Sequence, residues 1–289
     1  MNLRSLLFVP GDSERKLAKV ADSDADLVIF DLEDAVLPDR REAARALVAT
    51  ALATPSKPQR GVRINPVDTS DWTHDLAAVM PAAPAFVMQP KVRSVADVAT
   101  LDATISALEH KHGIAPGSTR IIALMTETPQ MLLALPTVTS LPKRVAALTW
   151  GGEDLSAALG ASTHHDAAGN WIATYQLARS LTLVAARACG VLAIDTLHAD
   201  FRDLEGLETV AGEARRDGFD GMMAIHPAQV PVINDAFTPS EEELAHARRV
   251  VAAFDAAPEA GVVQLDGRML DRPHLANAQR LLQNGQNQG

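Results

Sequence analysis

LVIFDLED, residues 27–34, is an apolar run that ends in three acids, Asp31, Glu33 and Asp34. Three further segments follow the same plan, in which a largely apolar run closes on a charged or polar side chain. They are GVRIN (61–65), IIALMTE (121–127) and VAALTWGGED (145–154). Such runs are typical of strands buried on both faces of a parallel sheet. In a parallel α/β barrel, residues at the carboxyl ends of the strands share one mouth, so these segments predict a common polar site.

Eight strand-like runs alternate with eight helical patterns along the chain. This alternation predicts a (β/α)8 TIM barrel rather than an open doubly wound sheet, which is the alternative. The expected strands are 5–9, 27–31, 61–65, 85–89, 121–125, 145–149, 192–196 and 221–225. The expected helices are 13–21, 39–53, 71–80, 94–112, 128–134, 171–188, 203–217 and 228–235, with Asp39 as a helix cap.

The C-terminal part of the sequence departs from this alternation. We expect a catalytic barrel over residues 1–235 and an extension over residues 236–289. Ser240 with Glu243 has the pattern of a capping box at a helix start. After it come an apolar run, the turn signal Asp266-Gly267 and a last helix from about residue 274 to 282. An extension of this length is expected to be a helical lid or arm that packs on a neighbouring subunit.

Composition excludes several classes of protein. The chain has 26 Lys and Arg against 36 Asp and Glu, a net charge of −10, which argues against a nucleic-acid partner. No apolar run approaches 18 residues, and the first one is too short for a signal peptide, so we expect no membrane span and a cytoplasmic location. The single cysteine, Cys189, excludes an internal disulfide and is expected to be a buried, inert thiol.

Two acids at strand ends, Glu127 and Asp154, suggest a metal site. With no His or Cys nearby in sequence they suit a hard cation such as Mg²⁺, which takes oxygen ligands and often only one or two protein carboxylates. The structural alternative is that each caps the helix that follows. The Gly151-Gly152 pair favours the site, because glycine lets a substrate approach the backbone closely.

Arg63 lies inside an apolar strand, where an unpaired charge is costly. Either it pairs with a protein carboxylate, or its planar guanidinium binds the carboxylate of a substrate. Glu33 and Asp34 are expected to line the site, with Asp31 a weaker candidate. Lys91, which closes the fourth strand, is a second cation that could pair with these acids.

Other polar groups are expected to be unremarkable. The loop pair His164-His165 lacks a third metal ligand nearby, so a solvated loop is favoured over a metal site. No GxSxG, GxxxxGK[ST] or GxGxxG motif is present, which argues against a serine hydrolase and against nucleotide binding.

Several longer motifs resemble one known family. They are RSLLFVPGDSERKLAKVADSDADLVIFDLEDAV, VRINP, QPKV, TETP, WGGEDLSAALG, IHPAQV, FTPSEEELAHARRVVAAF and DGRMLDRP. Together they are similar to the citrate lyase β-subunit-like family, which belongs with the malyl-CoA and citramalyl-CoA lyases of the HpcH/HpaI aldolase superfamily. The resemblance runs from Arg4 to about Ala278. It implies a (β/α)8 barrel that assembles into homotrimers or hexamers.

The resemblance also implies roles for particular residues. Glu127 and Asp154 would bind Mg²⁺, with Mn²⁺ as an alternative ion, and together with Gly152 would contact the substrate. Arg63 would hold the substrate's carboxylate or carbonyl oxygen. Glu33 and Asp34 would support metal-bound waters.

Two further roles concern the ends of the chain. Asp271, in the MLDRP match, would be the acid/base that a neighbouring subunit's lid delivers; the structural alternative is a helix N-cap before Pro273. Arg15 and Lys16, after the first strand, would meet the phosphates of coenzyme A.

The implied activity is Mg²⁺-dependent carbon–carbon lyase chemistry. A 3-hydroxyacyl thioester such as citramalyl-CoA, malyl-CoA or citryl-CoA would be cleaved to a 2-oxo acid and an acetyl thioester, or formed from them. The alternatives are a citrate lyase β-chain acting on a carrier-protein thioester, a CoA-independent metal-dependent aldolase of hydroxy-oxo acids, and a non-enzymatic binding protein.

Overall fold

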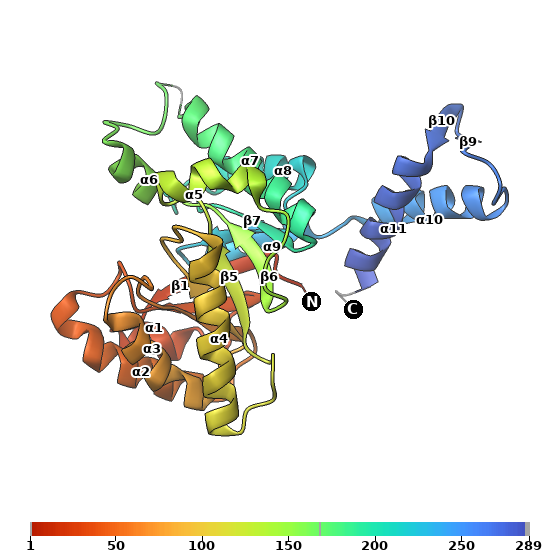
Figure 1. Ribbon diagram of the computed structural model, residues 1–289. Helices are drawn as coiled ribbons and strands as arrows, with labels where there is room; N and C mark the ends of the chain where they lie inside the picture. Colours follow the sequence, from red (N-terminus) through yellow and green to blue (C-terminus); the bar gives the residue numbers. More distant parts are fainter. Residues whose placement is uncertain (1, 168, 287–289) are drawn as a thin grey trace. The chain divides into compact units, whose positions relative to one another are not determined.

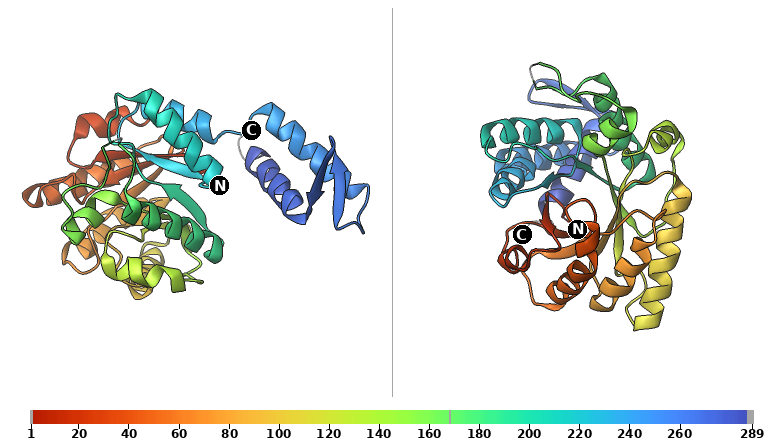
Figure 2. Two further views of the ribbon diagram at one scale, coloured as in Figure 1. Left: turned by 90° about the horizontal axis from the view of Figure 1, so that it is seen from above. Right: turned by 90° about the vertical axis from the view of Figure 1, so that its left-hand side faces the viewer.

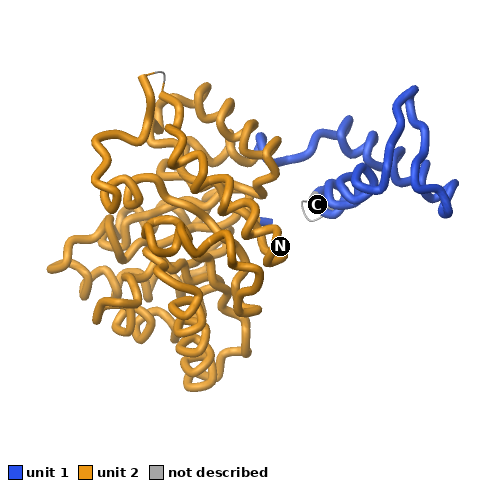
Figure 3. Tube along the Cα trace, turned by 45° about the horizontal axis from the view of Figure 1, so that its top comes forward, with its two compact units in different colours: residues 1–2, 235–289 blue, residues 3–234 orange. Residues whose placement is uncertain are grey.

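The computed structural model describes residues 2–167 and 169–286. The chain forms two compact units (Figure 3). The barrel unit comprises Leu3–Asn234, and the C-terminal unit comprises Asn2 and the residues from Asp235 onward. No helix among the described residues is long and apolar enough to cross a bilayer.

Within the described residues, eight parallel strands form a closed barrel in chain order, with β1 beside β8 (Figure 1). The strands are β1 (Ser5–Pro10), β2 (Leu27–Asp31), β3 (Gln59–Arg63), β4 (Phe86–Gln89), β5 (Arg120–Leu124), β6 (Val145–Thr149), β7 (Leu192–Asp195) and β8 (Gly221–Ala224). The predicted (β/α)8 barrel is confirmed. The predicted bounds of β2 and β6 agree with the structure, while Asn65 lies beyond β3 because its backbone N–H bonds to the Asp75 carboxylate instead of a neighbouring strand.

The barrel core is mainly aliphatic, in agreement with the low aromatic content. A buried cluster takes residues two apart from successive strands, such as Leu27 and Ile29 on β2 and Ile122 and Leu124 on β5. This spacing directs both side chains of a strand to the same face. Gly61 on β3 leaves room for Phe86, since a Cβ there would lie 2.9 Å from the Phe86 Cβ.

Helices alternate with the strands and lie outside the barrel (Figure 2). The helices of the barrel unit are α1 (Glu14–Lys19), α2 (Arg41–Ala53), α3 (Asp71–Val79), α4 (Val95–His112), α5 (Pro129–Ala134), α6 (Gly152–Leu159), α7 (Ala173–Cys189), α8 (Leu204–Asp217) and α9 (Gln229–Phe237). The last residues of α9 belong to the C-terminal unit. Short 3-10 turns are η1 (Pro38–Arg40), η2 (Met80–Ala82) and η3 (Leu135–Thr137). The described residues of the connection from β6 to β7 therefore form two helices, one more than predicted.

Two local predictions were wrong. Asp39 does not cap α2: it lies inside η1, because Pro38 begins a 3-10 turn there and the α-helix starts only at Arg41. Cys189 is half-buried rather than fully buried. Its Sγ lies 3.8 Å from the Val138 carbonyl oxygen, and burial raises the pKa of the thiol, which agrees with an inert role.

The C-terminal unit has a small core of its own. Helix α10 (Glu241–Asp255) starts at the predicted Ser240–Glu243 capping box. Strands β9 (Val262–Leu265) and β10 (Arg268–Asp271) form an antiparallel hairpin whose turn residues both have positive φ. Helix α11 (Arg272–Gln286) begins two residues earlier than expected. One buried cluster of this unit comprises Ala247, Val250, Phe254, Leu270 and Ala278.

Candidate active site

Asp31, the last residue of β2, holds the loop that follows it. Its two carboxylate oxygens accept hydrogen bonds from the backbone N–H groups of Glu33 (3.0 Å) and Ala35 (3.1 Å). They also accept from Nε and Nη2 of Arg63, at 2.7 and 2.6 Å. This bidentate ion pair joins the ends of β2 and β3. It fixes the plane of the Arg63 guanidinium.

Arg63 therefore pairs with a protein carboxylate, the first of the two alternatives. Its Nη1 atom lies 3.1 Å from Glu33 Oε2 and 3.8 Å from Asp34 Oδ2. The guanidinium lies over the Phe8 ring, 5.2 Å from its centroid. Burial disfavours the charge, but the hydrogen bonds and charge of Asp31 outweigh it and raise the pKa of Arg63. Arg63 is thus a permanent, oriented cation.

Glu33 is almost fully buried, at 2% exposure, whereas the side chain of Asp34 is 53% exposed. Burial raises the pKa of Glu33 to about 7, although the charges of Arg63 and Lys91 oppose that shift. The loop after β2 thus carries one buried acid that titrates near neutrality and one solvated acid.

Lys91 lies two residues beyond β4 and contacts four acids. Its backbone N–H donates to Glu127 Oε2 at 2.6 Å. Its Nζ donates to Glu33 and lies 3.1 Å from Asp34 Oδ2 and 3.2 Å from Asp154 Oδ1. The ion pairs raise the pKa of Lys91, although its partial burial opposes this. One residue thus links the acids that follow β2, β5 and β6.

Glu127 and Asp154 reach this cluster from different elements. Glu127 lies in the β5–α5 loop and is 5% exposed, while Asp154 is the third residue of α6. Burial and the neighbouring charges of Asp154 and Glu33 raise the pKa of Glu127. Gly151 allows this packing, because a Cβ there would lie 3.1 Å from Glu127 Oε1.

These two carboxylates suit a magnesium ion. The described residues contain no group of three or more His, Cys, Asp or Glu arranged to hold a metal. A two-carboxylate site fits Mg²⁺, which keeps several coordination positions for water and substrate. Carboxylates clustered closely enough to raise the pKa of Glu127 also have an electrostatic reason to take a cation. The residues present therefore fit the ion.

A cavity of about 1120 Å³ opens beside this cluster, and its walls include Arg63, Glu127, Asp154 and Gly152. Lys16 of α1 also lines it. Arg15 is exposed on the same helix and is not among the described residues that line the cavity. The cavity is large for an oxo acid alone and matches pockets that hold drug-sized molecules.

Aromatic side chains form another wall. A Cβ on Gly152 would lie 2.5 Å from the ring of Trp171, so only glycine fits there. The predicted solvated loop at His164-His165 was wrong. Both rings are partly buried because they pack on Trp171, with centroids 5.2 and 4.1 Å away. Tyr175 closes the cluster from α7, 5.8 Å from the Trp171 ring.

Sequence reasoning missed Asp195, a buried acid at the end of β7 that also lines the cavity. It accepts hydrogen bonds from Trp150 Nε1 at 2.6 Å and from Arg179 Nε at 2.9 Å. The signal was present, because LAID is another apolar strand that closes on an acid. Its partners lie 16 and 45 positions away in sequence and gave no local clue.

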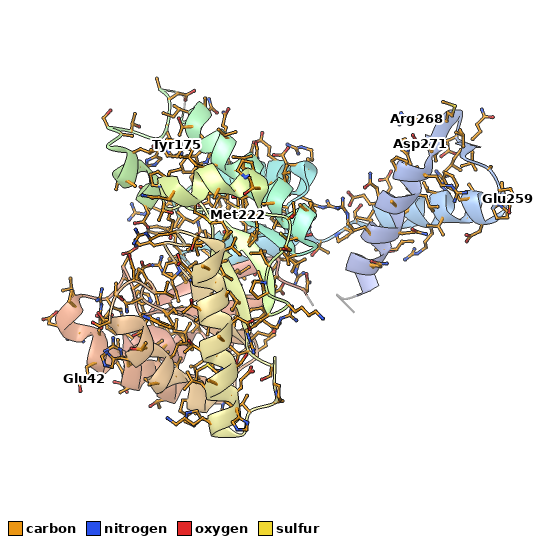
Figure 4. The ribbon with its side chains drawn as sticks, viewed as in Figure 1. Glu42, Tyr175, Met222, Glu259, Arg268 and Asp271 are labelled. Carbon is orange, nitrogen blue, oxygen red and sulfur yellow. The ribbon has the colours of Figure 1, made fainter. Side chains whose placement is uncertain are left out.

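Asp271 lies in the C-terminal unit, at the end of β10 (Figure 4). Its side chain is 52% exposed and paired with His274. The hydrogen bond from His274 lowers the pKa of the Asp271 carboxyl. Within its own unit, Asp271 is therefore an accessible carboxylate.

The chain is similar to known proteins of one family. A family model described as HpcH/HpaI aldolase/citrate lyase matches residues 4–227. A citrate lyase subunit beta-like protein of Mycobacterium tuberculosis is 38% identical over 287 residues, which cover 98% of this chain and 97% of the relative. The chain belongs to the HpcH/HpaI aldolase/citrate lyase family.

Other members of this family carry different names. A (3S)-malyl-CoA thioesterase of Cereibacter sphaeroides is 35% identical over 283 residues, covering 96% of this chain and 93% of the relative. The citrate lyase subunit beta of Haemophilus influenzae is 34% identical over 284 residues, covering 97% and 96%. Family membership confirms the resemblance and makes the chain an enzyme of the carbon–carbon lyase type.

Solved structures of the family hold ligands. Protein CitE from M. tuberculosis, in complex with magnesium, acetoacetate and coenzyme A, matches with a TM-score of 0.79 at 37% identity and 98% coverage of both chains. A citrate lyase beta subunit from the same organism, complexed with oxaloacetate and magnesium, matches with a TM-score of 0.69 at 37% identity. That match covers 83% of this chain and 100% of the other.

Proposed function

We propose that the protein is a magnesium-dependent lyase that cleaves a 3-hydroxyacyl-CoA to a 2-oxo acid and acetyl-CoA, or catalyses the reverse condensation. The observation that carries the proposal is the grouping of Arg63, Glu127 and Asp154 on one cavity, although they lie far apart in sequence. Both M. tuberculosis structures hold magnesium and a small keto acid, and one of them also holds coenzyme A, which supports this substrate class.

Glu127 and Asp154 would hold the magnesium ion. A bound Mg²⁺ supplies Lewis acidity, which favours loss of the proton from a substrate hydroxyl. Lys91 N–H keeps Glu127 in position through its 2.6 Å hydrogen bond. Manganese, which also prefers oxygen ligands, would be an alternative ion.

Arg63 would bind the substrate carboxylate and stabilise negative charge on the alkoxide oxygen that becomes the carbonyl oxygen of the 2-oxo acid product. Because Asp31 occupies Nε and Nη2, the group left for substrate is Nη1, which faces Glu33. A fixed cation needs no reorganisation as charge develops, and this is an efficient form of transition-state stabilisation. Glu33 and Asp34 would orient water molecules beside it.

Asp271 would exchange a proton with the methyl carbon of the acetyl group. In condensation the Asp271 carboxylate removes a proton from acetyl-CoA, the enolate carbon bonds to the carbonyl carbon of the 2-oxo acid, and the resulting alkoxide takes a proton from water. In cleavage these steps run in reverse, so that water takes the hydroxyl proton, the C–C bond breaks, and the enolate takes its proton from the protonated carboxyl of Asp271. The exposure of Asp271 on a separate compact unit supports delivery to a neighbouring subunit of a homotrimer or hexamer. Lys16, and Arg15 beside it, would meet the phosphates of coenzyme A.

The test is an assay of 2-oxo-acid release from malyl-, methylmalyl-, citramalyl- and citryl-CoA, each with Mg²⁺ and with EDTA. Free thiol is measured in parallel, because a thioesterase relative raises hydrolysis as an outcome. Magnesium-dependent oxo-acid release without free thiol supports the lyase. Thiol release without oxo acid, or no turnover of any of the four, contradicts it.

A further inference from the structure

Lys91 has an uncommon backbone as well as an unusual set of partners. Its φ of 50° lies in the left-handed region, which costs a non-glycine residue free energy. In this conformation the backbone N–H of Lys91 donates to Glu127, and the side-chain ammonium pairs with Asp154. A single lysine therefore touches both proposed magnesium ligands, one through its main chain and the other through its side chain.

Acidic residues outnumber basic residues around Lys91. Among the described residues of the cluster, five carboxylates face two cations, Arg63 and Lys91. The five are Asp31, Glu33, Asp34, Glu127 and Asp154. Arg63 is committed to Asp31 by two hydrogen bonds. Of these two cations, Lys91 is therefore the one that pairs with the proposed metal ligand Asp154.

We propose that Lys91 is a positioning residue that takes the place of the magnesium charge when the ion is absent. Its ammonium neutralises Asp154 in the metal-free protein and withdraws onto Glu33 and Asp34 when Mg²⁺ binds. Its backbone N–H holds Glu127 throughout. The inference rests on the proposed function for the assignment of Glu127 and Asp154 as the ligands.

Two opposite effects follow from this arrangement. Without Mg²⁺ the ammonium limits repulsion among the acids, so it stabilises the metal-free fold. During Mg²⁺ binding the same ammonium is a like charge that lies 3.2 Å from a ligand oxygen and must move away. Lys91 should therefore lower the affinity for magnesium and stabilise the fold of the metal-free protein.

The experiment measures magnesium affinity by titration calorimetry and thermal unfolding in EDTA, without reference to turnover. Lys91→Met removes the charge at nearly constant side-chain length. Lys91→Gly removes it in a residue that accepts positive φ, which guards against misfolding of the first variant. Lys91→Arg retains a charge, and Lys111→Met, at an exposed position on α4, is a matched control for net charge.

We expect Lys91→Met and Lys91→Gly to bind Mg²⁺ about threefold to thirtyfold more tightly than the natural chain. Lys91→Met should also unfold at lower temperature in EDTA and gain more from added Mg²⁺. Lys91→Arg and Lys111→Met should bind Mg²⁺ as the natural chain does. Unchanged or weaker magnesium affinity in both uncharged variants would overturn the inference. Failure of the CoA thioester assay alone would overturn the proposed substrate and leave the change in magnesium affinity as support for Lys91.

Discussion

Two buried ion networks among the described barrel residues lie at opposite ends of the strands and differ in their balance of charge. At the carboxyl ends, Glu33 and Glu127 have raised pKa values because burial and neighbouring acids outweigh their cations. At the amino end of β6, Arg144 binds Glu109 through two hydrogen bonds of 2.8 and 2.9 Å. Burial opposes the charge of Glu109, but Arg144 outweighs it and lowers the pKa of that carboxyl.

This difference indicates that the Arg144 network stabilises the fold and that the network at the carboxyl ends of the strands serves chemistry. Arg144 is surrounded by acceptors, since it also bonds to Asp102 at 2.7 Å and to the Thr119 carbonyl at 2.6 Å. Its network is complete without a ligand. The network at the carboxyl ends has excess negative charge, a state typical of sites that bind a cation or move protons. This agrees with the general placement of barrel active sites.

The largest expected effect comes from removing a proposed metal ligand. Glu127→Ala and Asp154→Ala should each lower magnesium-dependent turnover by about 10³-fold or more, since both the ion and its orientation would be lost. The measurement is oxo-acid release, with magnesium binding by calorimetry. Glu153→Ala, an exposed neighbour on α6 that pairs with His164, is the matched control and should retain activity. Near-normal turnover in both ligand variants would remove the distinction between the two networks.

Asp271→Ala should slow turnover by about 10²–10⁴-fold, the usual contribution of a general acid or base. Because Asp271 is exposed and lies in the C-terminal unit, magnesium affinity and the unfolding temperature of the protein should not change. The measurement is steady-state kinetics together with exchange of acetyl-CoA methyl protons into deuterated water. Unimpaired exchange in the variant would rule out the proton-transfer role.

Breaking the Arg144 network at the amino ends of the strands should lower stability and leave turnover and magnesium binding unchanged. Glu109→Ala removes the buried carboxylate that accepts two hydrogen bonds from Arg144 and leaves the partly exposed Asp102 as the acidic partner of the guanidinium. The substitution should therefore destabilise the fold by about 2–3 kcal/mol. Chemical denaturation would give this value. KM and magnesium affinity should stay unchanged in the fraction that remains folded. A loss of magnesium affinity without a loss of stability would reverse the assignment of the two regions.

The smallest expected effect concerns how the free energy of unfolding depends on pH when EDTA keeps the protein free of metal. Glu33 has a pKa raised from 4.5 to about 7, so its contribution to stability is fully present below about pH 4.5 and lost as pH rises through about 7. Glu109, with a lowered pKa, contributes stability above about pH 4.5 that is lost as pH falls through its folded value. Glu33→Gln should flatten the decline between pH 5 and 8, by up to about 3 kcal/mol. An identical decline in the variant would assign it to another group.

The fold was predictable because its pattern is local. Each strand is an apolar run with a polar end, and the runs for β2 and β6 predicted the bounds of those strands correctly. Apolar runs did not predict that β3 ends before Asn65. The Asn65 backbone bonds to the Asp75 carboxylate, a long-range partner that no local pattern indicates.

The pairing of site residues was less predictable. The sequence left two partners open for Arg63, because a strand residue can meet any neighbouring strand end. Lys91 was named as one more cation near the acids, but its left-handed backbone and its four acidic partners depend on the packed loops after β2, β5 and β6. Asp195 showed the expected strand-end pattern and was overlooked.

The close fit of Gly152 beneath the Trp171 ring has a consequence for changing this enzyme's substrate range. Enlarging residue 152 alone must displace the indole, and shrinking residue 171 alone leaves an unfilled gap beside the first turn of α6. Mutant libraries that vary the two codons jointly should therefore yield functional clones that single-site libraries miss, and substitutions at these positions should be correlated among relatives.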